Sequence, residues 1–217
     1  MNQGFKYPLL TIVLVCFFGT DPACSRTTQW DKYIDAGNAA YRQRQYARAL
    51  ESFSAALKEA ESFGPNDSRL ATSLNNLALV YDEQGKYAEA EPLYKRALAI
   101  LEKAFGPNHS SVATSLNNLA ALYCSQGKYA EAEPLYKRSL QIREGLDPNG
   151  PDVAQSLANY AVLLRKTKRV EQAKQMELRA KRIRAELGHR DSFSTGGAGA
   201  NLRPFSSLPV PKAGSGK

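Results

Sequence analysis

Histidine and cysteine, which supply many metal ligands and catalytic groups, are scarce in this 217-residue chain: it has two histidines and three cysteines. Cys16, Cys24 and Cys124 do not follow the spacing of a metal site, and three cysteines are too few for a disulfide framework. No Ser-His-Asp set and no glycine-rich phosphate loop is present. The sequence therefore predicts no catalytic residue, no metal site and no cofactor, and it argues against an enzyme with a small-molecule substrate.

A long hydrophobic run is also missing. The longest one, residues 8–19, has about 12 residues, whereas a membrane-spanning helix needs roughly 20. It follows a single lysine and precedes small residues, which is the layout of a secretory signal peptide. We therefore expect residues 1–25 to be a leader and the protein to be exported, to a periplasm or out of the cell. Retention in the cytoplasm with an unprocessed start is the alternative.

Two ways of processing this leader fit the residues. Ala23, Cys24 and Ser25 offer a small-x-small cleavage site, which would release the protein. Cys24 also resembles the acceptor cysteine of a bacterial lipoprotein, although Asp21 and Pro22 stand where such a motif usually has Leu and a small residue. In that case the protein would be anchored to a membrane through a lipid on Cys24.

Acidic residues are few near the C-terminus. Between Arg165 and Arg190 there are ten basic residues and three acidic ones, and this segment supplies most of the net charge of +8. We define the basic patch as Arg165, Lys166, Arg179, Lys181 and Arg182. Its residues fit a solvated terminal helix, and they also fit a surface that binds an acidic membrane or partner. Nucleic acid is disfavoured, because the segment has no interleaved aromatics and the leader indicates export.

What the chain does contain is an internal repeat. Residues 71–98 and 113–140 agree at 23 of 28 positions, and weaker copies begin at Gly37 and Ser156. Four alanines mark the same position in the four copies, at steps of 41, 42 and 41 residues: Ala49, Ala90, Ala132 and Ala173. A fixed period of this length indicates a stacked array rather than a single closed core.

Each copy has the pattern of two helices. In the second copy, Leu74, Leu77 and Tyr81 form one apolar stripe, Gly85 interrupts it, and a second stripe begins at Tyr87. Gly and Pro separate the copies, as in SFGPND and AFGPNH. We predict an all-α fold of about four helix-turn-helix repeats, at residues 28–65, 68–108, 110–150 and 152–187. A disordered tail rich in Gly, Ser and Pro is expected at residues 188–217.

This pattern resembles the tetratricopeptide repeat. The resemblance rests on a small residue at Gly37 and its counterparts, on aromatic pairs such as Tyr81 with Tyr87, and on the repeated alanines. The 42-residue step is similar to that of kinesin light chains and of many bacterial arrays. Arg44 and Lys168 depart from the usual glycine, and the fourth copy is divergent like a terminal cap. The resemblance implies a right-handed superhelix whose first helices line a concave groove.

A second stripe, turned away from the core, follows these first helices. It holds two adjacent asparagines in each of the two middle copies, although Asn is a mediocre helix former. An Asn offers both a donor and an acceptor to an extended peptide backbone. The resemblance places the following residues, which we call the groove residues, at such a surface: Thr72, Asn75, Asn76, Leu79, Asp82, Thr114, Asn117, Asn118 and Ala121. Cys124 continues the stripe as a small, unreactive side chain. In the outer copies Ile34 and Ala158 replace the first Asn.

These residues predict a non-enzymatic scaffold that binds a peptide or partner protein in its concave groove. The alternative for the asparagines is structural, as hydrogen-bond partners of neighbouring helices. The alternative for the whole protein is a peripheral binder that uses the basic patch.

Overall fold

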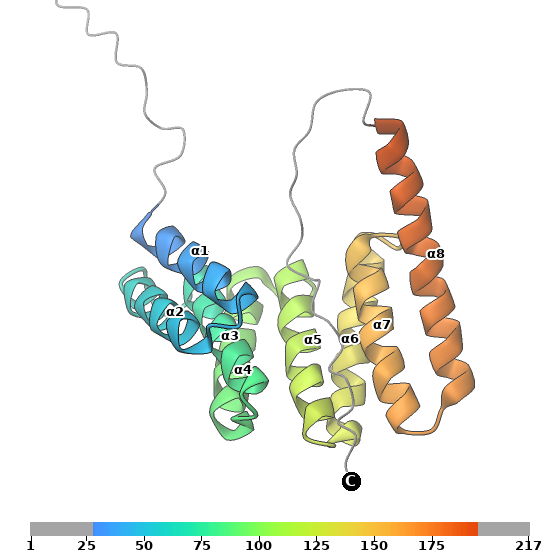
Figure 1. The fold of residues 1–217 in the computed structure, drawn as a ribbon, viewed down its shortest axis with the longest axis horizontal. Coiled ribbons are helices and arrows are strands. Elements are labelled where there is room, and N and C mark those ends of the chain that lie inside the picture. The colour runs from blue at the N-terminus through green and yellow to red at the C-terminus, as the bar shows by residue number, and fades with distance from the viewer. Residues whose placement is uncertain (1–27, 195–217) are drawn as a thin grey trace, which may run out of the picture.

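The computed structural model describes residues 28–194. In this part of the chain there are helices and no strands. The helices follow one another along the molecule from α1 at one end to α8 at the other (Figure 1). Their bounds are α1 Gln29–Arg42, α2 Tyr46–Glu61, α3 Ser68–Glu83, α4 Tyr87–Phe105, α5 Ser110–Ser125, α6 Tyr129–Leu146, α7 Pro151–Lys166 and α8 Val170–Ser194. The predicted all-α array of four helix pairs is confirmed.

The helix starts use ordinary capping chemistry. Thr28 and Asp31 form a capping box before α1, Asp67 accepts a hydrogen bond from the Arg69 backbone N–H before α3, and His109 does the same for Ser111 before α5. Each of these contacts satisfies a backbone donor that the first turn leaves unpaired. His109 therefore has a local structural role at the start of α5.

The turn inside each repeat uses a left-handed residue. Gly85 and Gly127 have φ values of 72° and 75° between the two helices of repeats 2 and 3. Arg44 and Lys168 occupy the same place in repeats 1 and 4, with φ values of 57° and 62°. The departure from glycine noted in the sequence therefore changes the residue but leaves the turn geometry intact.

The core follows the repeat. The four marker alanines are fully buried, and so are the large side chains of Tyr94 and Phe53. Each helix packs against its repeat partner, each second helix of repeats 1 to 3 packs against the first helix of the next repeat, and in addition α3 contacts α5 and α5 contacts α7. Among the described helices, no two second helices make contact of this extent. Because the inner elements of a curved array lie closer together, these contacts place the first helices on the concave side.

The outer boundaries differ in one respect from the expectation. Helix α8 continues to Ser194, so the predicted boundary at Leu187 lies within a helix. Gly188 lowers helix propensity, but no proline follows to stop the helix before Ser194. The leader at residues 1–25, with Cys24, and the tail beyond Ser194 lie outside the described residues.

Candidate functional site

Asn75 and Asn117, two of the predicted groove residues, form hydrogen bonds between neighbouring repeats. The side-chain oxygen of Asn75 accepts a hydrogen bond from the hydroxyl of Ser115 at 3.3 Å. The oxygen of Asn117 accepts one from the amide of Asn159 at 3.1 Å, and Asn117 is only 7% exposed. Each oxygen is therefore fixed by the repeat that follows. The side-chain oxygens of Asn75 and Asn117 therefore have the structural role that the sequence analysis gave as the alternative, as hydrogen-bond partners of a neighbouring helix.

The side-chain amide nitrogens of Asn75 and Asn117 make no hydrogen bond to a neighbouring repeat. Neither Nδ2 atom of Asn75 or Asn117 donates to a described residue, and neither is a fully buried unpaired atom. A side-chain amide whose oxygen is held and whose nitrogen reaches solvent is oriented to donate outward. Helices α3 and α5 thus each carry one side-chain amide donor without a described partner.

Asn159 is a member of this row that the sequence analysis missed. It corresponds by repeat to Asn118, not to Asn117, and its oxygen accepts a hydrogen bond from Gln155 at 2.9 Å. Its position in SLANYA, the counterpart of SLNNLA, was the available signal. Asn76 and Asn118 are half-buried and make no side-chain hydrogen bond with a described residue.

The remaining groove residues divide by chemistry. The hydroxyls of Thr72 and Thr114 donate back to their own helices, to the Ser68 carbonyl at 3.0 Å and the Ser110 carbonyl at 3.2 Å. Leu79 and Ala121 are half-buried and apolar. They form a short apolar surface beside the asparagines.

Asp82 and Cys124 occupy matching places at the far end of the stripe. Burial, and then the neighbouring Glu83, raises the pKa of Asp82 from 3.8 to about 7. Burial also raises the pKa of the Cys124 thiol, which keeps it protonated and unreactive near neutral pH. The sequence placed both residues on the same stripe, but it gave no sign of the perturbed carboxylate.

A row of buried serines forms a second connection between repeats. Ser73 accepts a hydrogen bond from Trp30 Nε1 at 2.9 Å, Ser115 donates to Asn75, and Ser156 accepts one from Arg143 at 2.6 Å. These serines occupy the same repeat position and are almost fully buried. Each one bonds to a side chain of the preceding repeat, from α1, α3 or α6, so the row connects successive repeats.

Arg143 is a buried cation without a carboxylate partner among residues 28–188. It is 7% exposed, and it donates to the Asp152 carbonyl at 3.0 Å, to Ser156 and to Thr114 Oγ1 at 3.1 Å. Burial lowers its pKa. Leu101 stands at the same position of repeat 2, whereas repeat 4 also has an arginine there, Arg184. It joins α5, α6 and α7 and holds Thr114.

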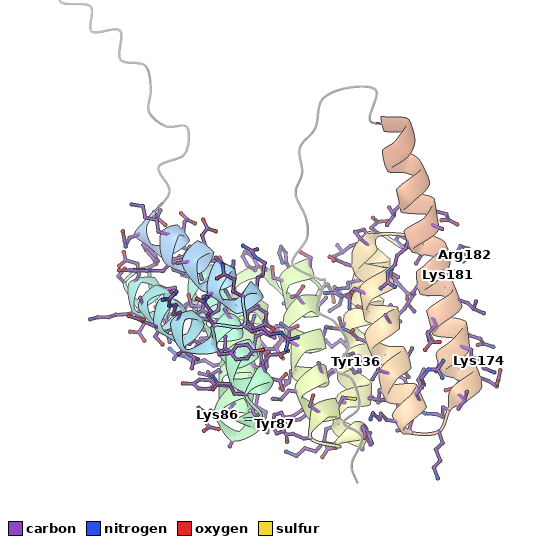
Figure 2. All side chains as sticks on the ribbon, in the orientation of Figure 1. Lys86, Tyr87, Tyr136, Lys174, Lys181 and Arg182 are labelled. Carbon is purple, nitrogen blue, oxygen red and sulfur yellow. The ribbon has the colours of Figure 1, made fainter. Side chains whose placement is uncertain are left out.

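The basic patch is partly neutralised. Arg165 forms a two-pronged ion pair with Glu177 at 2.7 Å, and Arg179 pairs with Glu144. Lys181 and Arg182 are exposed on α8, where Figure 2 shows Lys174 nearer the start of the same helix, and Arg182 pairs with Glu186 at 3.9 Å. Lys166 is exposed and makes no ion pair with a described residue.

Two surface cavities lie away from the groove residues. One of about 630 Å³ is lined by α1 and α2 side chains, including Tyr33 and Arg48, and one of about 510 Å³ includes Glu133, Tyr160 and Arg169. Within the described residues no group of three or more His, Cys, Asp or Glu side chains gathers as a metal site. None of the helices described is both long and apolar enough to cross a membrane.

Comparison with protein families decides the assignment. The model of the tetratricopeptide repeat matches residues 31–103, 84–145 and 111–186, which together cover most of the chain. The chain belongs to the tetratricopeptide repeat family. Members of this family are generally scaffolds for protein–protein interaction. A comparison with curated proteins finds no match.

Solved tetratricopeptide repeat structures of the kinesin-light-chain kind share this fold. BtubC (BKLC) from P. vanneervenii is 28% identical, with a TM-score of 0.64 over 88% of this chain and 75% of that one. A variant of a putative kinesin light chain of Podosopora anserina, with nearly identical repeats, is 21% identical, with a TM-score of 0.61 over 74% and 76%. The predicted likeness to kinesin-light-chain repeats is confirmed at the level of the fold.

Proposed function

We propose that this tetratricopeptide repeat array is a non-enzymatic adaptor that binds an extended segment of a partner protein along its concave face. The observation that carries the proposal is the pair of oriented amides at Asn75 and Asn117. Their oxygens are held by Ser115 and Asn159, and their nitrogens remain available. An extended peptide has unpaired carbonyls that such donors match.

The spacing of the two donors supports a chain-like ligand over a compact one. Asn75 and Asn117 occupy the same position in successive repeats, so they lie one repeat apart along the array. Leu79 and Ala121 add an apolar surface next to each donor. A ligand that runs across the repeats meets a donor and an apolar patch twice in the same order.

The experiment presents the full chain to a phage-displayed library of random peptides. Peptides that bind the groove should lose affinity for the Asn75→Ala/Asn117→Ala variant. They should keep it for Asn66→Ala/Asn108→Ala, which removes two exposed loop asparagines spaced in the same way. Recovered peptides that bind both variants equally well, or a library that yields no binder, would contradict the groove.

An exported setting is part of the proposal and is supported by the leader pattern of residues 1–25. The mature protein would begin after Ser25, or would carry a lipid on Cys24. Intact-mass measurement of the protein from its native host distinguishes cleavage, lipidation and an unprocessed start. An unprocessed mass would contradict export.

A second candidate function is favoured by the exposed face of α8. Lys174, Lys181 and Arg182 lie within one turn of Leu178 on α8, and Leu178 is 67% exposed, so basic side chains flank an apolar one on this helix. Lys174 pairs with Glu171 and Arg182 with Glu186, which leaves Lys181 as the cation of this group without a described acidic partner. Such a face fits an anionic membrane surface. Lys181→Glu/Arg182→Glu should then abolish binding to phosphatidylserine vesicles at low salt. Absence of vesicle binding by the unmodified protein would exclude this candidate.

A further inference from the structure

Three buried side-chain oxygen atoms without a hydrogen-bond partner occur near the ends of α1 and α3, in repeats 1 and 2. The side-chain oxygens of Asn38 on α1 and Gln84 after α3 are buried and make no hydrogen bond with a described residue. The hydroxyl of Tyr41 is in the same condition, and Tyr41 is only 6% exposed. A buried polar atom without a partner costs free energy, so such atoms require an explanation.

Two carboxylates lie near the Tyr41 hydroxyl, and Asn38 precedes Tyr41 by about one turn of α1. Asp82 and Glu83 end α3, and burial first, then the charges of Glu83 and Asp82, raise the pKa of Tyr41. Neither carboxylate forms an ion pair with a described lysine or arginine. Glu83 accepts a long hydrogen bond of 3.5 Å from the Tyr46 hydroxyl, and it lies close enough to the Tyr41 hydroxyl to raise its pKa. The half-buried Asp82 and the exposed Glu83 therefore lie side by side without a described counter-charge.

The C-terminal end of α3 adds to the negative charge of Asp82 and Glu83. The C-terminus of a helix carries a partial negative charge, and basic residues are favoured in its last turn. Helix α3 has none there and has two acids instead. In repeats 3 and 4 the positions of Asp82 and Glu83 hold Cys124, Ser125, Arg165 and Lys166. The acidic end is thus a property of repeat 2, not of the repeat pattern.

We propose that Asn38, Tyr41, Asp82 and Glu83 form a receptor for a lysine or arginine side chain of the bound peptide. An ammonium or guanidinium group carries only donors and a positive charge, so it satisfies the carboxylates and the unpaired oxygens together. A metal ion fits less well, because no metal-binding group of three acids, histidines or cysteines forms among the described residues. The proposal rests on the peptide groove, and it adds the chemistry of one position of the ligand.

The receptor also predicts a link between binding and protonation. The groups that face Asp82 are Glu83 on its own helix, Tyr41 on α1, Tyr94 on α4 and Tyr136 on α6, and none of them carries a positive charge. A bound cation favours the ionised carboxylate, so binding near pH 7 releases a proton from Asp82. Affinity for a basic peptide should therefore rise between about pH 6 and pH 8 in the unmodified protein, and it should stay flat in Asp82→Asn.

The test extends the library experiment on the full chain. Recovered peptides are expected to carry Lys or Arg at one recurring position. Changing that residue to Gln in a synthetic copy should weaken binding about tenfold. Asp82→Asn/Glu83→Gln should cause a similar loss, with little further loss when both partners are changed. Glu61→Gln/Glu89→Gln, which removes two exposed acids, should change affinity less than about twofold.

The outcomes separate the receptor from the groove itself. Peptides that lack a recurring basic residue, or that bind Asp82→Asn/Glu83→Gln as well as the unmodified protein, overturn the receptor. The groove stands in that case if the same peptides are sensitive to Asn75→Ala/Asn117→Ala. If no peptide is sensitive to the two asparagines, the groove and the receptor are both overturned.

Discussion

At the scale of single residues, Asp82 should make stability depend on pH. Its pKa is about 7 in the folded chain and ordinarily 3.8. Because the folded pKa is the higher one, the folded state holds an extra proton, and the free energy of unfolding falls as pH rises from about 4 to about 7. Asp82→Asn stays neutral. It should therefore melt at a higher temperature than the unmodified protein at pH 8 and at a similar one at pH 4. Parallel melting curves across this range would contradict the raised pKa.

Tyr136 tests the packing between repeats. It is buried in the core cluster that also holds Tyr94, and its ring centroid lies 6.2 Å from that of Tyr160 on α7 of the next repeat. Tyr136→Ala should cost about 3–5 kcal/mol, because a large side chain leaves a cavity in a stacked interface. Tyr136→Phe is the control, since the hydroxyl bonds to no described residue. Chemical denaturation measures both, and a loss under about 1 kcal/mol for the Ala variant would show that the interface collapses around the gap.

The residues of the candidate site could be predicted from the sequence only where they recur at the same position in two similar repeats. Asn75 and Asn117 recur within near-identical segments, so their surface stripe can be read from the sequence. Asn159 lies in a divergent copy and bonds to Asn117, a different position of the repeat. Arg143 replaces Leu101, and its burial depends on Ser156 and on a carbonyl of the next repeat. Contacts between repeats have no signature in a single sequence.

At the scale of the helix pair, the left-handed residue in each turn should affect stability in opposite directions, depending on whether it is glycine. Arg44 and Lys168 have side chains in a conformation that costs about 1 kcal/mol relative to glycine. Arg44→Gly and Lys168→Gly should each raise the free energy of unfolding by about that amount. Gly85→Ala and Gly127→Ala should lower it by a similar amount. Urea denaturation of the four variants is the measurement. Loss of stability in the first pair would mean that these side chains make contacts that outweigh the backbone strain.

The helices themselves were predictable because each carries its own signals. The apolar stripe, the Gly-Lys-Tyr turn and the Gly-Pro-Asn connection occur together in both middle repeats, and the structure has helix ends at these places. The C-terminal part of α8 shows where such signals fail. Gly188 is followed by polar residues typical of a tail, but helix α8 includes residues up to Ser194. A sequence without proline leaves the end of a terminal helix poorly specified.

At the scale of the whole molecule, ion pairs connect the outer helices across repeats. Glu133 on α6 receives two hydrogen bonds of 2.8 Å from Arg169, and it also contacts Lys137 and Tyr160. Arg169 and Lys137 lower the pKa of Glu133 to about 2. This stabilisation is complete above the ordinary pKa of 4.5 and is lost as pH falls toward 2.

Glu133→Gln should therefore be less stable than the unmodified protein at pH 6, and the difference should disappear near pH 2. The loss at pH 6 should be modest, about 1 kcal/mol, because the side chain is partly exposed and screened by water. Glu131→Gln, on an exposed position of the same helix, is the control. The measurement is the melting temperature of each variant at pH 6 and near pH 2. An equal loss of stability by Glu133→Gln at both pH values would exclude the ion pair as the cause.

The central claim is that Asn75 and Asn117 serve a ligand as well as the stacking of repeats. The most direct measurement is the melting temperature and the peptide affinity of the same Asn75→Ala/Asn117→Ala variant, using one peptide recovered from the library. The lost hydrogen bonds to Ser115 and Asn159 cost about 1 kcal/mol each, and the better helix propensity of Ala returns about 0.7 kcal/mol per site. The account predicts a nearly unchanged melting temperature and an affinity lower by about 1–3 kcal/mol. Strong destabilisation without a binding defect in the folded fraction would contradict it.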